Sequence, residues 1–196
     1  MKCLSMKRLF VAAAAVVVAL AAAAPAAATT AWFSFARQSN LNSTLTLNWE
    51  PMPGKFSTIS WRAGSGYGGN GECVVGAGWL PAGWYDLWGH WDHYEGSKIK
   101  GRVFYLQDKR CWNGTLRSEL FIHSEETADQ GQYCPSSYDD PFCWEGDFDY
   151  ASSGCIKVAH AQPYPSDIAL AHQFWHEKSG DYRHGSFWMN DFLYVY

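Results

Sequence analysis

Hydrophobic and polar positions alternate with a period of two along much of the chain. Residues 44–49 place apolar side chains at every second position, residues 56–61 alternate again at Ile59 and Trp61, and the sequence Pro51-Met52-Pro53-Gly54 lies between the two stretches. Such alternation predicts half-buried β-strands, and the intervening turn predicts a hairpin.

The later part of the chain continues this pattern and adds one helix. Further strands are predicted at the end of the turn-rich passage 76–85, over 98–106, over 116–123, directly after Cys155 and over 192–196. Residues 166–178 have an apolar helical stripe, with Ser166 as N-cap and Asp167 in the first turn. We therefore predict a mainly β fold, of mixed sheets or a sandwich, with one short helix after Cys155.

The first 28 residues differ in composition from the rest. Lys2, Lys7 and Arg8 precede an apolar run over residues 9–24, and small residues follow at 25–28. This pattern is typical of a cleaved signal peptide, and the run is shorter than the ~20 residues of a membrane span. A retained N-terminal anchor is the alternative. We divide the chain into a signal peptide at 1–28, an N-terminal tail at 29–43 and one domain at 44–196.

The length and the net charge of the chain limit the classes of function that it can have. The 196 residues suffice for one domain with a sizeable core. The formal net charge is −4, and because the leader carries three basic residues, the mature part carries −7. A nucleic-acid-binding protein needs a clustered basic face. Lys98, Lys100 and Arg102 form the one dense basic stretch, which we interpret as a solvated edge, so no nucleic-acid partner is expected.

The cysteines indicate one odd thiol in an oxidising compartment. Once Cys3 leaves with the leader, five cysteines remain. An odd number in a secreted protein suggests a free reactive thiol or an intermolecular bridge. Four cysteines allow three pairings, among which the sequence does not choose. We favour Cys134 with Cys143, closing a local loop, and Cys73 with Cys111, which leaves Cys155 unpaired.

Cys155 follows the small-residue turn Ser152-Ser153-Gly154 and precedes a β-branched strand. Glycine tolerates positive φ and leaves the following N–H groups free to face a developing oxyanion. A free cysteine has a pKa of ~8.5 and needs a base or a cationic neighbour. His123, at the end of a predicted strand, is the best candidate for that base. The residues alone also allow a packed histidine and a paired cysteine.

These residues resemble the signature of the L,D-transpeptidases, the cysteine acyltransferases of bacterial cell-wall peptidoglycan. That family shows Ile-His-Gly and, after a variable gap, Ser/Thr-His-Gly-Cys-Ile/Val-Arg. The chain has Phe121-Ile122-His123 and then Ser152-Ser153-Gly154-Cys155-Ile156-Lys157. The passage 80–85 resembles the family's Thr-Pro-x-Gly-x-Phe/Tyr entry to a strand. The resemblance spans residues 44–196, and the cysteine turn is its specific part.

Several positions depart from the family pattern. Ser124 replaces the glycine after the first histidine, and Ser153 replaces the histidine before Gly-Cys. Lys157 replaces the arginine, which keeps the positive charge but loses the bidentate hydrogen bonding of a guanidinium. The gap before Cys155 is also longer, with the Cys134/Cys143 loop as an apparent insertion. Some branches of this wider group also lack the second histidine and use the upstream one as base, so the resemblance places that role on His123, with His160 as the reserve candidate.

The resemblance implies acyl transfer on peptidoglycan stem peptides, with no cofactor. It also implies a secreted, cell-wall-associated monomer that has no stable membrane association once the leader is cleaved. The thiolate attacks the carbonyl joining an L-centre to a D-residue, and an amine or water resolves the thioester. The N–H groups of Gly154 and Cys155 hold the oxyanion. The implied catalytic set is Cys155, His123, Gly154 and Ser153, and the implied substrate-binding set is Ser152, Lys157, Arg117 and Trp144.

Two other functions remain open. A secreted glycan-binding β-domain would use aromatic rings, 17% of the chain, against sugar faces, although most rings are expected in the core. A papain-like peptidase would pair Cys155 with His172, His176 or His184. That order usually places the cysteine at the start of a long helix, whereas residues 156–158 predict a strand.

The histidine and carboxylate clusters do not predict a metal site. His90 and His93 have no third ligand nearby in the sequence, and His172 and His176 lack the His-Glu-x-x-His arrangement. The acidic stretch 124–150 lacks the alternating pattern of a calcium loop. We interpret it as a solvated lid.

Overall fold

The computed structural model describes residues 30–135, 140–160, 165–180 and 191–196. The expected signal peptide at 1–28 lies outside these residues. Within them, no helix combines the length and the apolar character that a membrane crossing requires.

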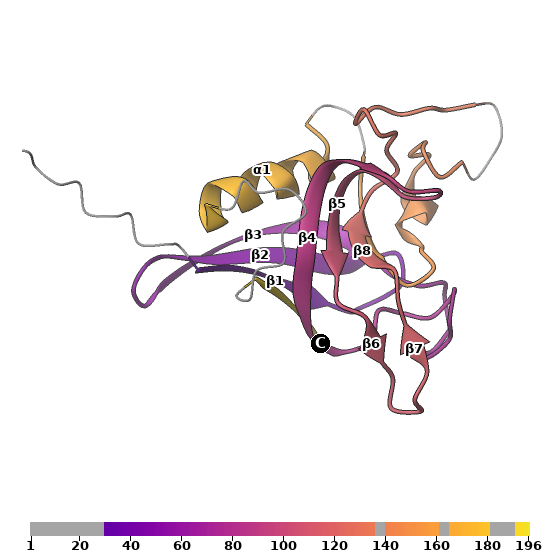
Figure 1. Cartoon of the computed structure of the whole chain (residues 1–196), viewed down its shortest axis with the longest axis horizontal. Helices are drawn as coiled ribbons and strands as arrows, with labels where there is room; N and C mark the ends of the chain where they lie inside the picture. The colour runs from indigo at the N-terminus through magenta and orange to yellow at the C-terminus, as the bar shows by residue number, and fades with distance from the viewer. Residues whose placement is uncertain (1–29, 136–139, 161–164, 181–190) are drawn as a thin grey trace, which may run out of the picture.

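Eight strands of the described chain close into a barrel, and one helix packs against it (Figure 1). In barrel order they are β1 (Thr30–Ala36), β10 (Phe192–Val195), β4 (Gly83–Glu95), β5 (Lys100–Leu106), β8 (Leu120–His123), β9 (Ile156–Val158), β3 (Lys55–Gly64) and β2 (Ser43–Met52). A separate hairpin contains β6 (Lys109–Arg110) and β7 (Leu116–Arg117), and the 3₁₀ turn η1 (Asp147–Tyr150) precedes the cysteine turn. The prediction of a mainly β fold with one short helix is confirmed, with a closed barrel in place of a sandwich.

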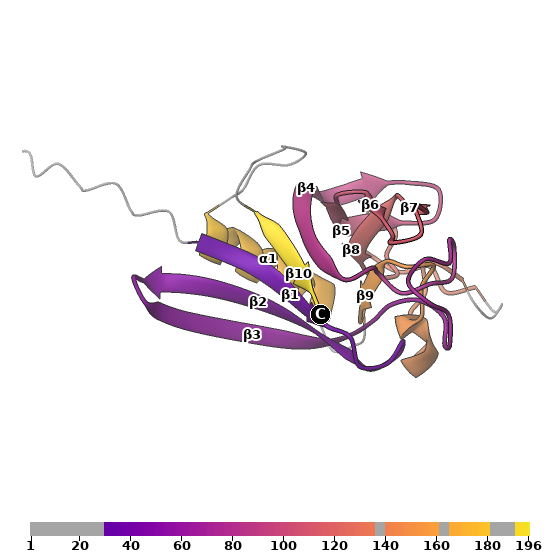
Figure 2. The ribbon, with the colours of Figure 1, turned by 90° about the horizontal axis from the view of Figure 1, so that it is seen from below.

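The prediction of an N-terminal tail at 29–43 is wrong for residues 30–36, which form β1. This strand pairs antiparallel with β2 and parallel with β10, and Figure 2 shows it between them. Its alternate residues Phe33 and Phe35 are fully buried. Two buried aromatic rings remove enough apolar surface from water to hold this short segment in the barrel.

The predicted strand 116–123 is divided into β7 and β8. Glu119 has a φ of +54°, a left-handed conformation that interrupts an extended strand. Beyond this bend, β8 pairs antiparallel with β5 and parallel with β9. The parallel pairing brings β8 beside the cysteine turn.

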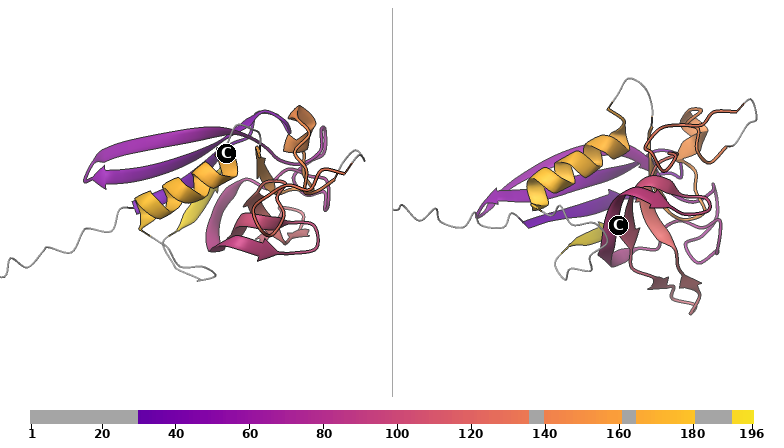
Figure 3. Two further views of the ribbon diagram at one scale, coloured as in Figure 1. Left: turned by 90° about the horizontal axis from the view of Figure 1, so that it is seen from above. Right: turned by 45° about the horizontal axis from the view of Figure 1, so that its top comes forward.

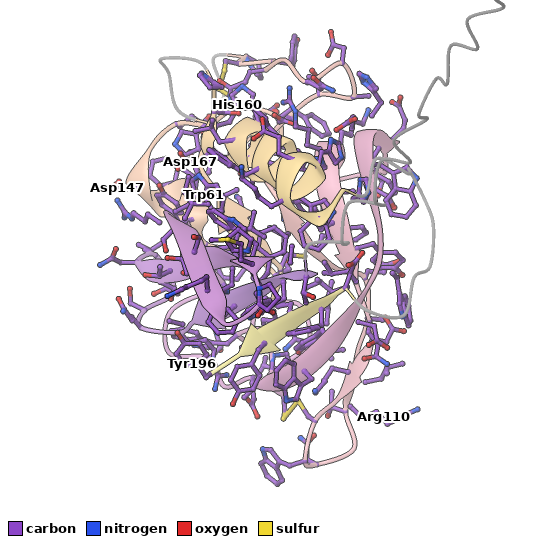
Figure 4. The ribbon with its side chains drawn as sticks, turned by 90° about the vertical axis from the view of Figure 1, so that its left-hand side faces the viewer. Trp61, Arg110, Asp147, His160, Asp167 and Tyr196 are labelled. Atoms are coloured by element: carbon purple, nitrogen blue, oxygen red, sulfur yellow. A yellow bond between two sulfur atoms is a disulfide. The ribbon has the colours of Figure 1, made fainter. Side chains whose placement is uncertain are left out.

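Helix α1 (Asp167–Ser179) forms within one residue of its predicted ends. The Ser166 hydroxyl accepts a 3.4 Å hydrogen bond from the Ala169 N–H, and Gly180 ends the helix in a left-handed conformation. The helix lies along β1 and β2 (Figure 3), with Trp61 of β3 beside it (Figure 4). Its apolar stripe joins the main core through Ile168, Ala171 and Trp175.

The β4–β5–β8–β9 part of the barrel separates two apolar clusters. Phe104 and Ile122 belong to the main core, on the side that faces α1. The opposite side carries a smaller cluster of Val103, Phe121 and Cys155. Because neighbouring residues of a strand point to opposite faces, Cys155 and the helix lie on opposite sides of this sheet.

Two disulfides confirm the favoured pairings. Cys73 is joined to Cys111, and Cys134 is joined to Cys143. Cys155 is a free and buried thiol.

Candidate active site

Cys155 and His123 line one cavity of about 680 Å³ on the outer side of the barrel. This volume lies within the usual range of small-molecule sites. The cavity has an aromatic wall and a charged rim, formed by Tyr94, Tyr105, Phe121, Lys98 and Glu119.

The strand register explains why the two residues share a cavity. Across the parallel strands β8 and β9, His123 pairs with Lys157 and Ile122 pairs with Ile156. Alternate residues share a face, so Phe121, His123, Cys155 and Lys157 point to the same side. Cys155 is therefore the diagonal neighbour of His123.

His123 has a fixed tautomer. Its Nδ1 lies 2.9 Å from the carbonyl oxygen of Ser124. A carbonyl only accepts, so Nδ1 carries the proton and Nε2 keeps the lone pair that a general base needs. Burial, with a smaller contribution from Lys157, lowers the pKa of His123 to about 3. The imidazole is therefore neutral at physiological pH.

Cys155 is held as a neutral thiol. Its Sγ donates to the carbonyl oxygen of Glu119 at 3.6 Å, and no hydrogen bond joins it to His123 in the described structure. Burial raises the pKa of Cys155 to about 11, although the Phe121 amide, Lys157 and Arg117 act in the opposite direction. The resting site thus contains a neutral pair, with no preformed thiolate and imidazolium.

Ser152 holds the cysteine turn from inside. Its hydroxyl donates to the Cys155 carbonyl at 2.6 Å and accepts from the N–H groups of Gly66 and Gly154 at 3.1 and 3.2 Å. The Gly154 N–H is therefore already engaged, which corrects its expected role as an oxyanion donor. The Ser152 hydroxyl likewise belongs to the turn and is not placed as a substrate contact, whereas Ser153 is exposed on the cavity wall.

Arg117 fixes the same turn from the β7 side. Its guanidinium donates to the carbonyls of Glu72, Trp79, Gly78 and Ser153, the last two at 3.2 Å. These backbone carbonyls take its hydrogen bonds, and Arg117 also lines the Cys155 cavity. Its expected part in substrate binding stays a prediction. Gly154 has a φ of +124°, and a Cβ at this position would overlap the guanidinium.

Lys157 is neutralised by a residue that the sequence analysis missed. It forms an ion pair with Glu125, and the two residues are only 8% and 6% exposed. Burial raises the pKa of Glu125 to about 7, and Lys157 opposes that shift. Lys157 lines the cavity but has its charge paired with Glu125. Its expected part in substrate binding stays a prediction. In the sequence, the one signal that Glu125 belongs to the site was its position two residues after His123.

Trp144 and His160 lie away from the Cys155 cavity. Trp144 packs edge-on against Tyr150, with ring centroids 4.8 Å apart, and lines a second cavity of about 430 Å³ together with His160. The Nδ1 of His160 lies 2.9 Å from a carboxylate oxygen of Glu126. The expectation that Trp144 shapes the Cys155 groove is thus wrong, and His160 is not placed to act as the reserve base.

The structure also addresses the papain-like alternative. His172 and His176 lie on α1, across the sheet from Cys155, so neither faces the thiol. His184, the third histidine of that alternative, lies outside the described residues.

No protein-family model and no curated protein matches the sequence. Among solved structures, the chain is similar to a mutant form of the helical cell shape determining protein Pgp2 from Campylobacter jejuni, with a TM-score of 0.46 and 14% identity. The match covers 85% of this chain and 47% of that one, so the chain spans less than half the length of that protein.

Proposed function

We propose that the protein is a secreted cysteine acyltransferase that acts on peptidoglycan stem peptides through a thioester on Cys155. One observation carries the proposal: a free thiol and an imidazole with an available Nε2 lie on the same face of the sheet and line one cavity. The resemblance of the cysteine turn to the L,D-transpeptidase signature supports the choice of substrate.

The neutral pair determines how the reaction begins. Cys155 rotates from the Glu119 carbonyl towards a bound substrate, and its proton passes to His123 Nε2 as Sγ bonds to the carbonyl carbon. Proton transfer accompanies the attack because neither group is charged beforehand. The Cys155 N–H is assigned to the oxyanion, with Arg117 adding positive potential.

The remaining steps return the enzyme to its starting state. The carbon–nitrogen bond breaks, and the leaving amine takes the proton from His123, which leaves a thioester. An acceptor amine (transpeptidation) or water (carboxypeptidation) then attacks the thioester and gives its proton to His123. That proton returns to the departing Cys155 sulfur, so no cofactor is consumed.

The surroundings support a cell-wall substrate and an extracytoplasmic location. The exposed Lys98 at the rim suits the carboxylate of a donor stem, and the exposed Glu119 suits the amine of an acceptor. Disulfides such as Cys73–Cys111 are typical of proteins that fold outside the cytoplasm. We assign the working form as a monomer.

The test compares wild-type protein with Cys155→Ala on purified muropeptides. Wild-type protein is expected to give crosslinked or trimmed stems and an acyl adduct on Cys155 in the intact mass spectrum, and Cys155→Ala is expected to give neither. Circular dichroism checks that the variant is folded. Turnover by folded Cys155→Ala at the wild-type rate would show that the nucleophile is another group.

Glycan binding is a second candidate function, favoured by a row of aromatic rings on the outside of the barrel. The aromatic row crosses β3, β1, β10 and β4, and consecutive ring centroids are 4.5 to 6.0 Å apart. It consists of Phe56, Trp32, Phe192, Trp84, Tyr194 and Tyr196, the last of which is labelled in Figure 4. Exposed apolar surface of this extent indicates an interaction site.

Cosedimentation with insoluble peptidoglycan tests this surface. The double variant Trp84→Ala/Tyr194→Ala is expected to lose binding, whereas Trp112→Ala is expected to keep it. Trp112 is the matched control because it is 86% exposed and lies on the β6–β7 hairpin, away from the row. Equal binding by all three proteins would remove the aromatic row from consideration.

A further inference from the structure

Three histidines from two distant elements meet between β4 and α1. His90 lies on β4, and His172 and His176 lie one turn apart on α1. One ligand nitrogen of each lies within 4.8 Å of the other two. The ring centroids are 5.0 to 6.2 Å apart. The fold thus supplies the third histidine that neither sequence pair has on its own.

Two of these nitrogens already have the spacing of metal ligands. Nε2 of His176 lies 3.4 Å from Nδ1 of His90. A tetrahedral ion that binds nitrogen at ~2.0–2.1 Å holds two ligands ~3.4 Å apart. Both nitrogens can therefore reach one ion without a change in their separation.

The third histidine is oriented by a carboxylate. His172 is 2% exposed, and its Nδ1 lies 3.1 Å from a carboxylate oxygen of Asp92. The carboxylate fixes the proton on Nδ1, so Nε2 carries the lone pair. In the described structure this Nε2 is buried and has no hydrogen-bond partner. A buried, unsatisfied acceptor is costly unless a ligand fills its position.

We propose that His90, His172 and His176 bind one Zn²⁺ ion. Imidazole nitrogen suits Zn²⁺, and the 3.4 Å spacing fits tetrahedral geometry. The contact between Asp92 and His172 is the carboxylate–histidine–metal arrangement that orients a ligand and raises its basicity. Three protein ligands leave the fourth coordination position for water.

The zinc site is separate from the Cys155 cavity. His90 pairs with Phe104 across β4 and β5, whereas the next residue, Trp91, pairs with Val103 on the Cys155 side. The ion would lie on the helix side of the sheet and join α1 to β4. Its role is to fasten the helix to the barrel, so this inference does not depend on the proposed acyl transfer.

Metal binding is measured on the tag-free mature protein, first with Zn²⁺ by calorimetry and then with Co²⁺ by visible absorption. Wild-type protein is expected to bind one ion per chain, to show the intense bands of tetrahedral Co²⁺ and to melt at a higher temperature with Zn²⁺. His172→Ala is expected to lose all three signals. Asp92→Asn, which keeps the ligands but weakens their orientation, is expected to bind ~10–100-fold more weakly.

His93→Ala is the matched control because His93 lies on the same strand, is exposed and is not part of the cluster. It and Cys155→Ala are expected to bind Zn²⁺ as the wild-type protein does. Should His172→Ala fail to fold, the half-buried His176 provides the second variant, His176→Gln. Absence of stoichiometric binding to wild-type protein, or unchanged affinity in the folded ligand variants, would overturn the proposal.

Discussion

His123 pairs in register with Lys157 across the parallel strands β8 and β9, and Cys155 is its diagonal neighbour. Burial keeps the imidazole neutral, and the arrangement adds to this effect by placing the Lys157 side chain directly beside the ring. It also leaves the thiol free to point to the Glu119 carbonyl in the resting state. The diagonal geometry therefore favours a base that acts during the attack over a resting thiolate.

Replacement of His123 by Gln is expected to lower kcat by about 10²–10⁴-fold, the usual contribution of a general base. KM is expected to stay near the wild-type value, because the imidazole transfers a proton and does not anchor the substrate. Steady-state assays of muropeptide products measure both constants. His93→Gln, an exposed substitution on β4, serves as control; an equal loss in both variants would contradict the assignment of the base.

Much of the fold could be predicted because its signals are local. The hairpin of β2 and β3 follows from alternation and a turn, and α1 follows from its cap and apolar stripe. β1 could not be recognised in this way, since its burial depends on partners from both ends of the chain, β2 and β10.

The reactive residues of the candidate site could be predicted from the sequence, because each of them supplies its chemistry on its own. Cysteine counting predicted one odd thiol, and the favoured pairings left it at Cys155, which is free in the structure. The partners of the charged side chains depend on tertiary structure. Arg117 donates hydrogen bonds to carbonyls of the 72–79 loop, and Lys157 forms an ion pair with Glu125. The histidine cluster was missed for the same reason, because His90 and His172 are far apart in the sequence.

Acid is expected to destabilise the protein through His123. Its pKa is about 3 in the folded state and 6.5 in the reference state, so the unfolded chain takes up the proton first as the pH falls. The stabilisation is fully present above about pH 6.5 and is lost as the pH falls towards 3, at about 1.4 kcal/mol per pKa unit. Urea unfolding across this range is expected to give a flatter profile for His123→Gln. Parallel profiles for the two proteins would contradict the prediction.

Gly154→Ala is expected to be more destabilising than Gly146→Ala. Both glycines have positive φ, +124° and +138°, so both substitutions strain the backbone by roughly 1–3 kcal/mol. Only at Gly154 does the new Cβ also overlap the Arg117 guanidinium, whereas nothing lies within 4 Å at Gly146. The free energies of unfolding in urea measure the difference. Equal values would mean that Arg117 moves aside without loss.

The two disulfides are expected to contribute unequally to stability. Cys73 and Cys111 are 38 residues apart, whereas Cys134 and Cys143 are 9 apart. In the chain-entropy account the larger loop restricts the unfolded state more, which favours Cys73–Cys111 by about 1 kcal/mol. Cys73→Ala/Cys111→Ala is therefore expected to lose more unfolding free energy than Cys134→Ala/Cys143→Ala. The comparison uses urea titrations of both double variants without reductant, and the reverse order would show that the native contacts of the smaller loop outweigh chain entropy.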